Sequence, residues 1–260
     1  MKEQSSLCTK VREGRLSVGS WLTSGYPLTC EMMARAGFEW LVIDMEHTSI
    51  GTWSAQQLIQ VADLAGCPPL VRVGANDPLA IKRAMDAGAH GVLVPMINTP
   101  DEAKRAVEAL YYPPRGTRGC GLARAQGYGV AFEAYRQWAS ENVLLIVQIE
   151  HHQAVGNLTD IVAVDGVDGF IVGPYDLSGS LGIPGQFDHP LMREQISKIN
   201  RVIRSTSKAA GYHVVHSNPK ELRKRIDEGY RFIAYGDDMV FLAEKLQAEY
   251  DSICEVVLGD

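Results

Sequence analysis

The fold is decided by the stretch LLIVQIE at residues 144–150, an apolar run that a glutamate, Glu150, closes. A second stretch, FIVGPYD at residues 170–176, closes in the same way on Asp176. Each run is typical of a strand buried in a parallel sheet, and each carboxylate comes where such a strand stops. In an α/β barrel the functional groups come from the carboxyl ends of the strands and the loops after them. The two carboxylates are therefore placed to share one metal ion.

Strand-like runs recur along the chain with helical segments between them. The eight runs are Ser17–Ser24, Trp40–His47, Pro69–Gly74, Gly91–Ile97, Leu144–Glu150, Asp168–Pro174, Ala210–His216 and Arg231–Gly236. Alternating β and α elements predict a parallel sheet, and eight units are the number that closes a barrel. We predict an α/β protein that forms a single-domain (β/α)8 TIM barrel over residues 1–260. The doubly wound open sheet is the alternative, although GxGxxG does not follow an early strand here.

Composition narrows the classes of function. A length of 260 residues is usual for a one-domain barrel, and 46% hydrophobic with 22% charged residues is ordinary for a globular protein. The net charge of −6, with no basic run, argues against nucleic-acid binding. Five cysteines without a CxxC pair predict neither a disulfide framework nor a zinc site, which favours a reducing cytoplasm. No signal-peptide pattern and no long apolar run are present, so we expect no export and no membrane span.

Two segments lie outside the eight predicted strand and helix units. The longest connection, between the fourth and fifth strands, contains YPPRGTRGCG at residues 112–121. A long Gly- and Arg-rich loop in a compact domain is more often functional than a linker. Residues 239–257 predict one amphipathic helix, which either closes the barrel or docks on a neighbouring subunit.

Polar side chains gather at the ends of four predicted strands. They are Asp44, Glu46 and His47 after the second strand, Arg72 in the third, Gln148 and Glu150 in the fifth, and Asp176 after the sixth. Carboxylate oxygens suit Mg²⁺ or Mn²⁺, and Mg²⁺ commonly takes one or two carboxylates while leaving positions for substrate. Glu150 and Asp176 fit that role, with capping or salt bridging at the barrel rim as the alternative.

Arg72 and His47 are the candidate catalytic residues of this cluster. Arg72 is a charge in an otherwise apolar strand, so it needs an anionic partner, either a structural acid or a substrate carboxylate or enolate. His47 is either structural or a general base, and the neighbouring ionisable groups favour the base. A zinc site at His151 and His152 is not favoured, because adjacent side chains are expected to diverge.

The positions of the lysines argue against an aldolase that forms a Schiff base. A Schiff-base aldolase in a barrel needs a lysine on an inner strand, whereas the lysines here fall on predicted helices or flanking segments. Activation of a carbonyl substrate is then expected to come from a metal ion.

The motifs together resemble those of the HpcH/HpaI aldolases, a family of metal-dependent class II enzymes of pyruvate chemistry. The resemblance covers roughly residues 14–243. Its motifs are DMEH at 44–47, VR at 71–72, NDP at 76–78, VPM at 94–96, YPPRG at 112–116, RG at 118–119, VQIE at 147–150 and GPYDLS at 173–178. Their joint pattern is highly specific, although each motif alone is not.

The resemblance implies a role for each candidate residue. These roles are metal ligand for Glu150 and Asp176, enolate stabilisation for Arg72, an acid/base dyad for His47 with Asp86, and pyruvate binding for Gln148 and the backbone N–H groups of Tyr175 and Asp176. Asp86 comes from the resemblance alone, because its surroundings read as an ordinary helix end. The expected cofactor is Mg²⁺ or Mn²⁺, with Co²⁺ as a third candidate. The resemblance also implies a homohexamer, a trimer of dimers, with the C-terminal helix region exchanged between partners.

Two departures from the family pattern bear on the acceptor. Tyr175 stands where alanine is common, and the 119–126 loop is shorter than in the heptanedioate aldolases and lacks their pyruvate-contacting serine. We therefore expect reversible retro-aldol cleavage of a 4-hydroxy-2-oxo acid to pyruvate and an aldehyde of unknown identity. The alternatives are a carbon–carbon lyase acting on an acyl-CoA thioester, like the citrate lyase β and malyl-CoA lyase relatives, and a catalytically silent binding protein.

Overall fold

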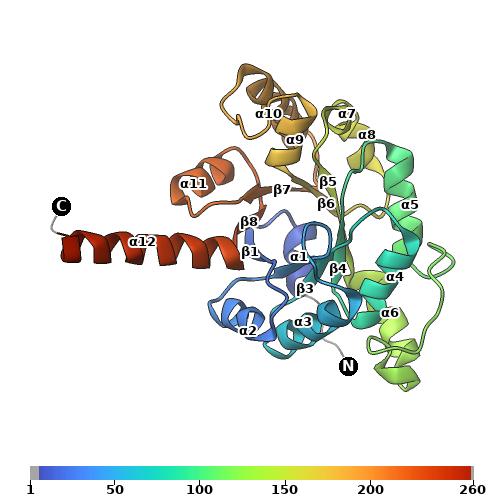
Figure 1. Ribbon diagram of the computed structural model, residues 1–260. Helices are drawn as coiled ribbons and strands as arrows, with labels where there is room; N and C mark the ends of the chain where they lie inside the picture. Colours follow the sequence, from blue (N-terminus) through green and yellow to red (C-terminus); the bar gives the residue numbers. More distant parts are fainter. Residues whose placement is uncertain (1–5, 259–260) are drawn as a thin grey trace.

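Eight parallel strands close into a barrel in chain order, with β1 paired to both β2 and β8 (Figure 1). The computed structural model describes residues 6–258. The strands are β1 (Ser17–Leu22), β2 (Leu41–Asp44), β3 (Pro69–Arg72), β4 (Gly91–Val94), β5 (Leu144–Ile149), β6 (Gly169–Val172), β7 (Ala209–Val214) and β8 (Phe232–Asp237). The predicted TIM barrel is confirmed, and closure between β1 and β8 excludes the open sheet.

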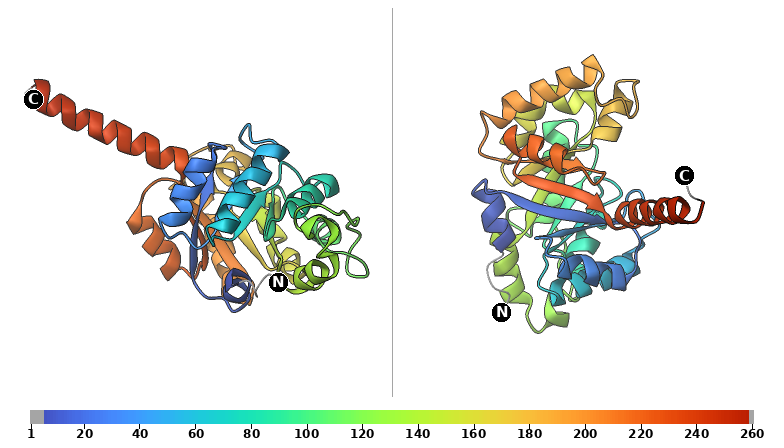
Figure 2. Two further views of the ribbon diagram at one scale, coloured as in Figure 1. Left: turned by 90° about the horizontal axis from the view of Figure 1, so that it is seen from below. Right: turned by 90° about the vertical axis from the view of Figure 1, so that its left-hand side faces the viewer.

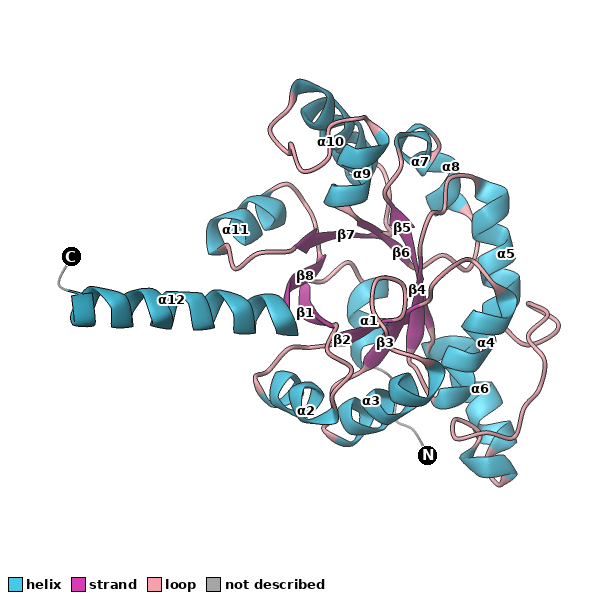
Figure 3. Cartoon of the chain, viewed as in Figure 1, coloured by secondary structure: helices cyan, strands magenta, loops and turns pink. Residues whose placement is uncertain are grey.

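Helices surround the barrel and return the chain to the amino ends of the strands (Figure 3). They are α1 (Ser6–Arg12), α2 (Pro27–Arg35), α3 (Thr52–Leu64), α4 (Pro78–Ala87), α5 (Pro100–Leu110), the 3-10 turn η1 (Gly127–Gly129), α6 (Phe132–Asn142), α7 (His152–Gly156), α8 (Leu158–Ala163), α9 (Pro174–Ser180), α10 (Pro190–Ile203), α11 (Pro219–Asp227) and α12 (Asp238–Leu258). Local sequence fixes several of their ends. Asp77 caps α4, and Gly88 ends it with a φ of 107°. Thr99 and Glu102 form a capping box on α5.

The interior of the barrel is filled by side chains and is closed at one end by α1. Leu7, Cys8 and Val11 of α1 belong to the same buried cluster as Trp40 and Phe232, whose rings stack 4.0 Å apart. Gly19 is needed for this packing, because a Cβ there would lie 2.1 Å from the Trp40 ring. With its amino end closed by α1, the interior of the barrel opens at the carboxyl ends of its strands, where ligands bind in such barrels.

The long connection after α5 lies on the outside of the barrel beside α4 and α6 (Figure 1). Its backbone is fixed there by hydrogen bonds from Thr117 N–H to Glu108 and from Ala125 N–H to Asp86. Within one chain the loop is thus attached to the outer helices rather than to the opening.

The C-terminal helix α12 leaves the barrel after β8 and projects away from it in every view (Figure 2). Five apolar residues form one stripe along it, and all are exposed: Leu242, Leu246, Tyr250, Ile253 and Val257. None of the described helices combines the length and the low polarity that crossing a bilayer requires. The helix predicted for residues 239–257 is confirmed, and within one chain it does not close the barrel.

Candidate active site

A cavity of about 150 Å³ lies at the carboxyl ends of the strands. Its lining comes from the ends of six strands or the segments after them: Trp21, His47, Arg72, Gln148, Ile171, Val172, Gly173, Pro174, Tyr175, Asp176, His213 and Val215. Since a water molecule needs roughly 10–15 Å³ by this measure, there is room for a small organic acid. Five residues of the sequence-based set, His47, Arg72, Gln148, Tyr175 and Asp176, therefore meet at one cavity.

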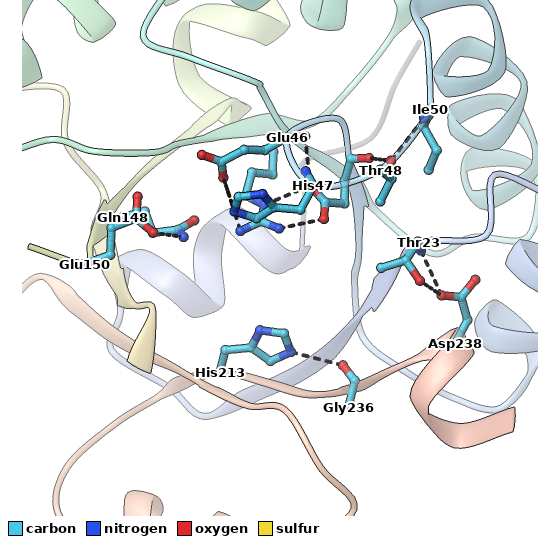
Figure 4. A network of polar contacts seen from close by, with 12 residues as sticks. Thr23, Glu46, His47, Thr48, Ile50, Gln148, Glu150, His213, Gly236 and Asp238 are labelled. Carbon is cyan, nitrogen blue, oxygen red and sulfur yellow. Dashed lines mark hydrogen bonds and ion pairs between the residues drawn. The ribbon is translucent and has the colours of Figure 1, made fainter. Parts of the chain in front are cut away.

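Arg72 is held by two acids from the end of β2, Asp44 and Glu46, the second of which is labelled in Figure 4. Its Nε and Nη2 donate to the two carboxylate oxygens of Asp44 at 2.9 and 2.6 Å, which is the bidentate geometry that guanidinium favours. Its Nη1 lies 3.2 Å from Oε2 of Glu46 as an ion pair. N–H groups on Nη1 and Nη2 remain for a ligand in the cavity. The buried arginine thus has the anionic partner that its sequence position requires.

Asp44 acts as the anchor of this network. Burial alone would raise the pKa of Asp44, but the hydrogen bonds and charge of Arg72 hold it below its ordinary value. The same carboxylate accepts from the backbone N–H groups of Glu46 and His47. The loop that carries His47 is fixed in this way, while the His47 ring itself is 59% exposed, with Nε2 at 3.8 Å from Glu46.

Glu150 and Gln148 project into the barrel from the end of β5. Successive side chains on a strand alternate, so these two residues lie on the same face, and Gln148 Nε2 donates to Glu150. The other oxygen of Glu150 accepts from Met96 N–H at 2.7 Å. Gly173 leaves room for the pair, because a Cβ there would lie 3.0 Å from Glu150 Oε2 and 3.1 Å from Gln148 Nε2.

Three carboxylates of the site repel one another. Burial and the charges of Glu46 and Asp176 raise the pKa of Glu150 to about 7. Burial, together with Asp44 and Asp176, also raises the pKa of Glu46 to about 7, against the opposing charge of Arg72. Such a cluster favours either protons or a cation.

The donor set fits a divalent cation held mainly by substrate and water. Buried Gln148 Oε1 has no hydrogen-bond partner, so one polar atom faces the site unsatisfied. Across residues 6–258 no three His, Cys, Asp or Glu side chains converge as a closed metal cage. Two carboxylates with open positions are what Mg²⁺ commonly uses.

Comparison with known proteins decides the family. The sequence matches the family described as HpcH/HpaI aldolase/citrate lyase over residues 17–244. The chain belongs to this family. It is 38% identical over 229 residues to 2-dehydro-3,6-dideoxy-6-sulfogluconate aldolase of Pseudomonas putida, covering 88% of this chain and 89% of that protein. It is 36% identical over 247 residues to 4-hydroxy-2-oxo-heptane-1,7-dioate aldolase of Shigella sonnei, covering 94% and 93%.

A solved structure supports the same assignment. An HpcH/HpaI aldolase/citrate lyase family protein from Burkholderia cenocepacia superposes with a TM-score of 0.91 at 32% identity, covering 96% of this chain and 99% of that one. The predicted family and the predicted lyase of aldolase type are confirmed. None of the eight strands of this HpcH/HpaI barrel carries a lysine, so its aldolase chemistry has no Schiff-base residue on an inner strand.

Asp86 is the one candidate that the fold of this HpcH/HpaI chain separates from the others. It lies in the last turn of α4, next to the segment in which His90 N–H bonds the carbonyl of Pro69 at the amino end of β3. Its carboxylate accepts from Arg118 Nη2 at 2.6 Å and from Gln126 Nε2 at 3.0 Å. His47 lies at the opposite, carboxyl end of the strands, so the two residues do not meet within one chain.

Trp21 and His213 were missed by the reading of the sequence. Their rings stack 4.5 Å apart in the cavity lining, and the Arg72 guanidinium lies over Trp21 at 5.2 Å. The alternation of side chains along β7 could have identified His213. Ala209 belongs to the cluster inside the barrel, whereas Tyr212 and Val214 belong to the cluster between the strands and the helices. His213, two positions beyond Gly211, therefore points inward.

The expectation for His151 and His152 needs a correction. Their rings do not diverge but lie 4.2 Å apart, because His151 caps α7 and His152 turns to bond Ser180. Both rings are thus engaged by the start of α7 and its neighbour α9.

Proposed function

We propose that this HpcH/HpaI protein is a metal-dependent aldolase that cleaves a 4-hydroxy-2-oxo acid reversibly to pyruvate and an aldehyde. The observation that carries the proposal is the position of Arg72, which keeps free N–H groups in a cavity beside Glu150 and Asp176. A planar donor beside a cation site suits an oxyanion that develops on a 2-oxo acid. The names of the two aldolase relatives support the substrate class, since both describe 2-oxo acids of this kind.

Glu150 and Asp176 are the proposed metal ligands. A divalent cation, Mg²⁺, Mn²⁺ or Co²⁺, supplies Lewis-acid chemistry at the 2-oxo group when bound. Arg72 donates hydrogen bonds to the oxygen that becomes the enolate oxygen of pyruvate. Gln148 and the backbone N–H groups of Tyr175 and Asp176, in the first turn of α9, orient the pyruvate half. Gly173 keeps the approach to Glu150 free of a side chain.

His47 is the proposed acid/base residue. Its exposed ring nitrogen takes the proton of the 4-hydroxyl group as the carbon–carbon bond breaks, directly or through a water, and returns it in the condensation direction. Imidazole suits this exchange because its ordinary pKa lies close to neutral pH.

The dyad of His47 with Asp86 requires two chains. Because the two residues lie at opposite ends of one barrel, Asp86 of one subunit pairs with His47 of another in the proposed homohexamer. The exposed apolar stripe on α12 supports assembly, since an isolated projecting helix would leave it in water. We propose that this helix is exchanged within each dimer of the trimer of dimers.

The test is pyruvate release from a panel of 4-hydroxy-2-oxo acids, with Mg²⁺ or Mn²⁺ and after chelation. We expect release with metal, no release after chelation, and recovery on adding metal back. Release only from acyl-CoA thioesters would favour the alternative lyase, and no turnover of either class would favour a silent barrel. The five cysteines are free, which supports a cytoplasmic location.

A further inference from the structure

The cavity at the carboxyl ends continues into a second one of about 230 Å³. Pro174, Tyr175, His213 and Val215 line both, so they mark the place where the two meet. The pyruvate half of the substrate is assigned to the first cavity by Arg72 and Gln148. The aldehyde-derived half therefore extends past His213 and Tyr175 toward the second cavity.

The hydrogen bonding of His213 fixes which nitrogen carries its proton. Nε2 lies 3.2 Å from the carbonyl oxygen of Gly236, and a carbonyl can only accept, so Nε2 is the protonated nitrogen. Burial lowers the pKa of His213 to about 4, which keeps the ring neutral. Nδ1 is then an acceptor, and no described residue donates to it. Figure 4 shows this nitrogen turned toward the middle of the site, on the side opposite His47.

The His213 ring is also held in one position. Trp21 stacks on its face at 4.5 Å with the planes 14° apart, and Gly236 holds its far edge. An acceptor that is held in one place and lacks a donor selects ligands that supply one. The 4-hydroxyl group is assigned to His47 on the opposite side. The donor for His213 is therefore a different hydroxyl group.

Tyr175 provides a second hydrogen-bond acceptor where the two cavities meet. Its phenol oxygen lies 3.3 Å from His216 Nε2, while His216 Nδ1 lies 3.1 Å from Glu244. Because the Glu244 carboxylate can only accept, Nδ1 of His216 donates to it, and Nε2 in that tautomer accepts a hydrogen bond from the Tyr175 hydroxyl group. The Tyr175 oxygen, whose hydrogen is directed to His216, keeps its lone pairs as acceptors. Both groups thus favour a ligand that donates hydrogen bonds.

We propose that His213 is a specificity-determining residue whose Nδ1 accepts a hydrogen bond from a hydroxyl group on C5 of the substrate. The preferred acceptor is then an α-hydroxyaldehyde, and the cleaved compound is a 4,5-dihydroxy-2-oxo acid. This inference rests on the proposed function, since it extends the same site by one carbon.

The experiment compares 2-hydroxypropanal with propanal as acceptors for pyruvate, measuring kcat/KM with Mg²⁺ present. A hydrogen bond between neutral groups is worth up to about tenfold, so the wild type should prefer the hydroxyaldehyde by about that factor. His213→Leu and His213→Phe remove the acceptor and should bring the ratio to within about twofold. The His213→Phe variant keeps an aromatic ring stacked on Trp21. If one of the two variants fails to fold, the other is sufficient for the test. His213→Asn retains an acceptor near Nδ1 and should restore part of the preference.

Controls separate this inference from the proposed function. Deuterium exchange at the methyl group of pyruvate needs no aldehyde, so it shows whether each His213 variant keeps the enolate-forming site, and the acceptor ratios are compared among variants that exchange. His189→Asn, a change at the N-cap of α10 away from the site, should leave the acceptor ratio unaltered. No preference in an exchanging wild-type enzyme, or a preference that both apolar variants retain, overturns the role of His213. Failure of the wild type to exchange overturns the proposed function instead.

Discussion

At the residue scale, Arg72 joins the structural network to the cavity. Asp44 takes two of its hydrogen bonds and Glu46 pairs with Nη1, which leaves one N–H group each on Nη1 and Nη2 for a ligand. Arg72→Lys replaces a planar fork by a point charge that cannot serve Asp44 and an oxyanion together. We predict a fall in kcat for aldol cleavage of about 10² to 10³, the range for loss of one oxyanion donor. The matched control is Arg35→Lys, which changes an arginine in an exposed ion pair. Near-normal turnover by Arg72→Lys would show that Arg72 does not stabilise the enolate.

Glu150 links metal binding to pH. Its pKa is about 7 in the folded protein and 4.5 ordinarily, so between these values the folded state binds more protons than the unfolded state. The metal-free protein therefore loses stability from this group as the pH rises toward 7, and Mg²⁺ or Mn²⁺ should bind more tightly over the same range.

Glu150→Gln removes this effect along with the proposed metal ligand. At pH 8, after chelation, the variant should melt a few °C above the chelated wild type, because about 1 kcal/mol shifts Tm by roughly 2–4 °C at this size. The difference should shrink as the pH falls and disappear below about pH 4.5, the ordinary pKa of the group, and metal should no longer raise the Tm of the variant. Glu31→Gln, on an exposed helix, is the control. Equal melting of the chelated proteins at pH 8, or a normal metal shift in Glu150→Gln, would contradict the assignment.

At the element scale, the first turn of α9 and the end of β5 meet at Gly173. Gly173→Ala places a Cβ against Glu150 and Gln148 and should weaken metal binding by about tenfold or more, as changes around metal ligands commonly do. Gly179→Ala, in the same helix, meets nothing within 4 Å and should bind metal normally. Calorimetric titration with Mn²⁺ measures both. Equal affinities in the two variants would show that the space at Gly173 has no role in the metal site.

At the scale of the whole molecule, the His47–Asp86 dyad should form between chains. Mixing His47→Ala chains with Asp86→Asn chains, followed by reassembly, should return activity, because about a quarter of randomly formed sites receive both native residues. Pairing within a chain would yield none, and the mixture would then be no more active than the separate variants.

The complementation needs a stability control. Asp86→Asn removes the charge that faces the fully buried side chain of Arg118, so we expect a cost in stability of roughly 3 kcal/mol. Melting curves of each variant identify the temperature at which both remain folded, and mixing is done below it.

Much of the barrel and part of the candidate site could be predicted from the sequence, because both depend on local patterns. Buried strands are apolar runs, and Glu150 and Asp176 stand out because a carboxylate is conspicuous where such a run ends. Asp86 carries no such local signal, since its partners Arg118 and Gln126 come 32 and 40 residues later. His213 is not evident from the sequence pattern, because an apolar run predicts a strand without showing which of its residues face the inside of the barrel.

The most direct test of the central claim is deuterium exchange at the methyl group of pyruvate, followed by NMR with Mg²⁺ or Mn²⁺ present and after chelation. Exchange requires the enolate and hence the groups assigned to Arg72, Glu150 and Asp176, but needs no knowledge of the acceptor. We predict metal-dependent exchange by the wild-type protein and almost none by Glu150→Gln at the same metal concentration. Exchange that survives exhaustive chelation, or that Glu150→Gln sustains at the wild-type rate, would contradict it.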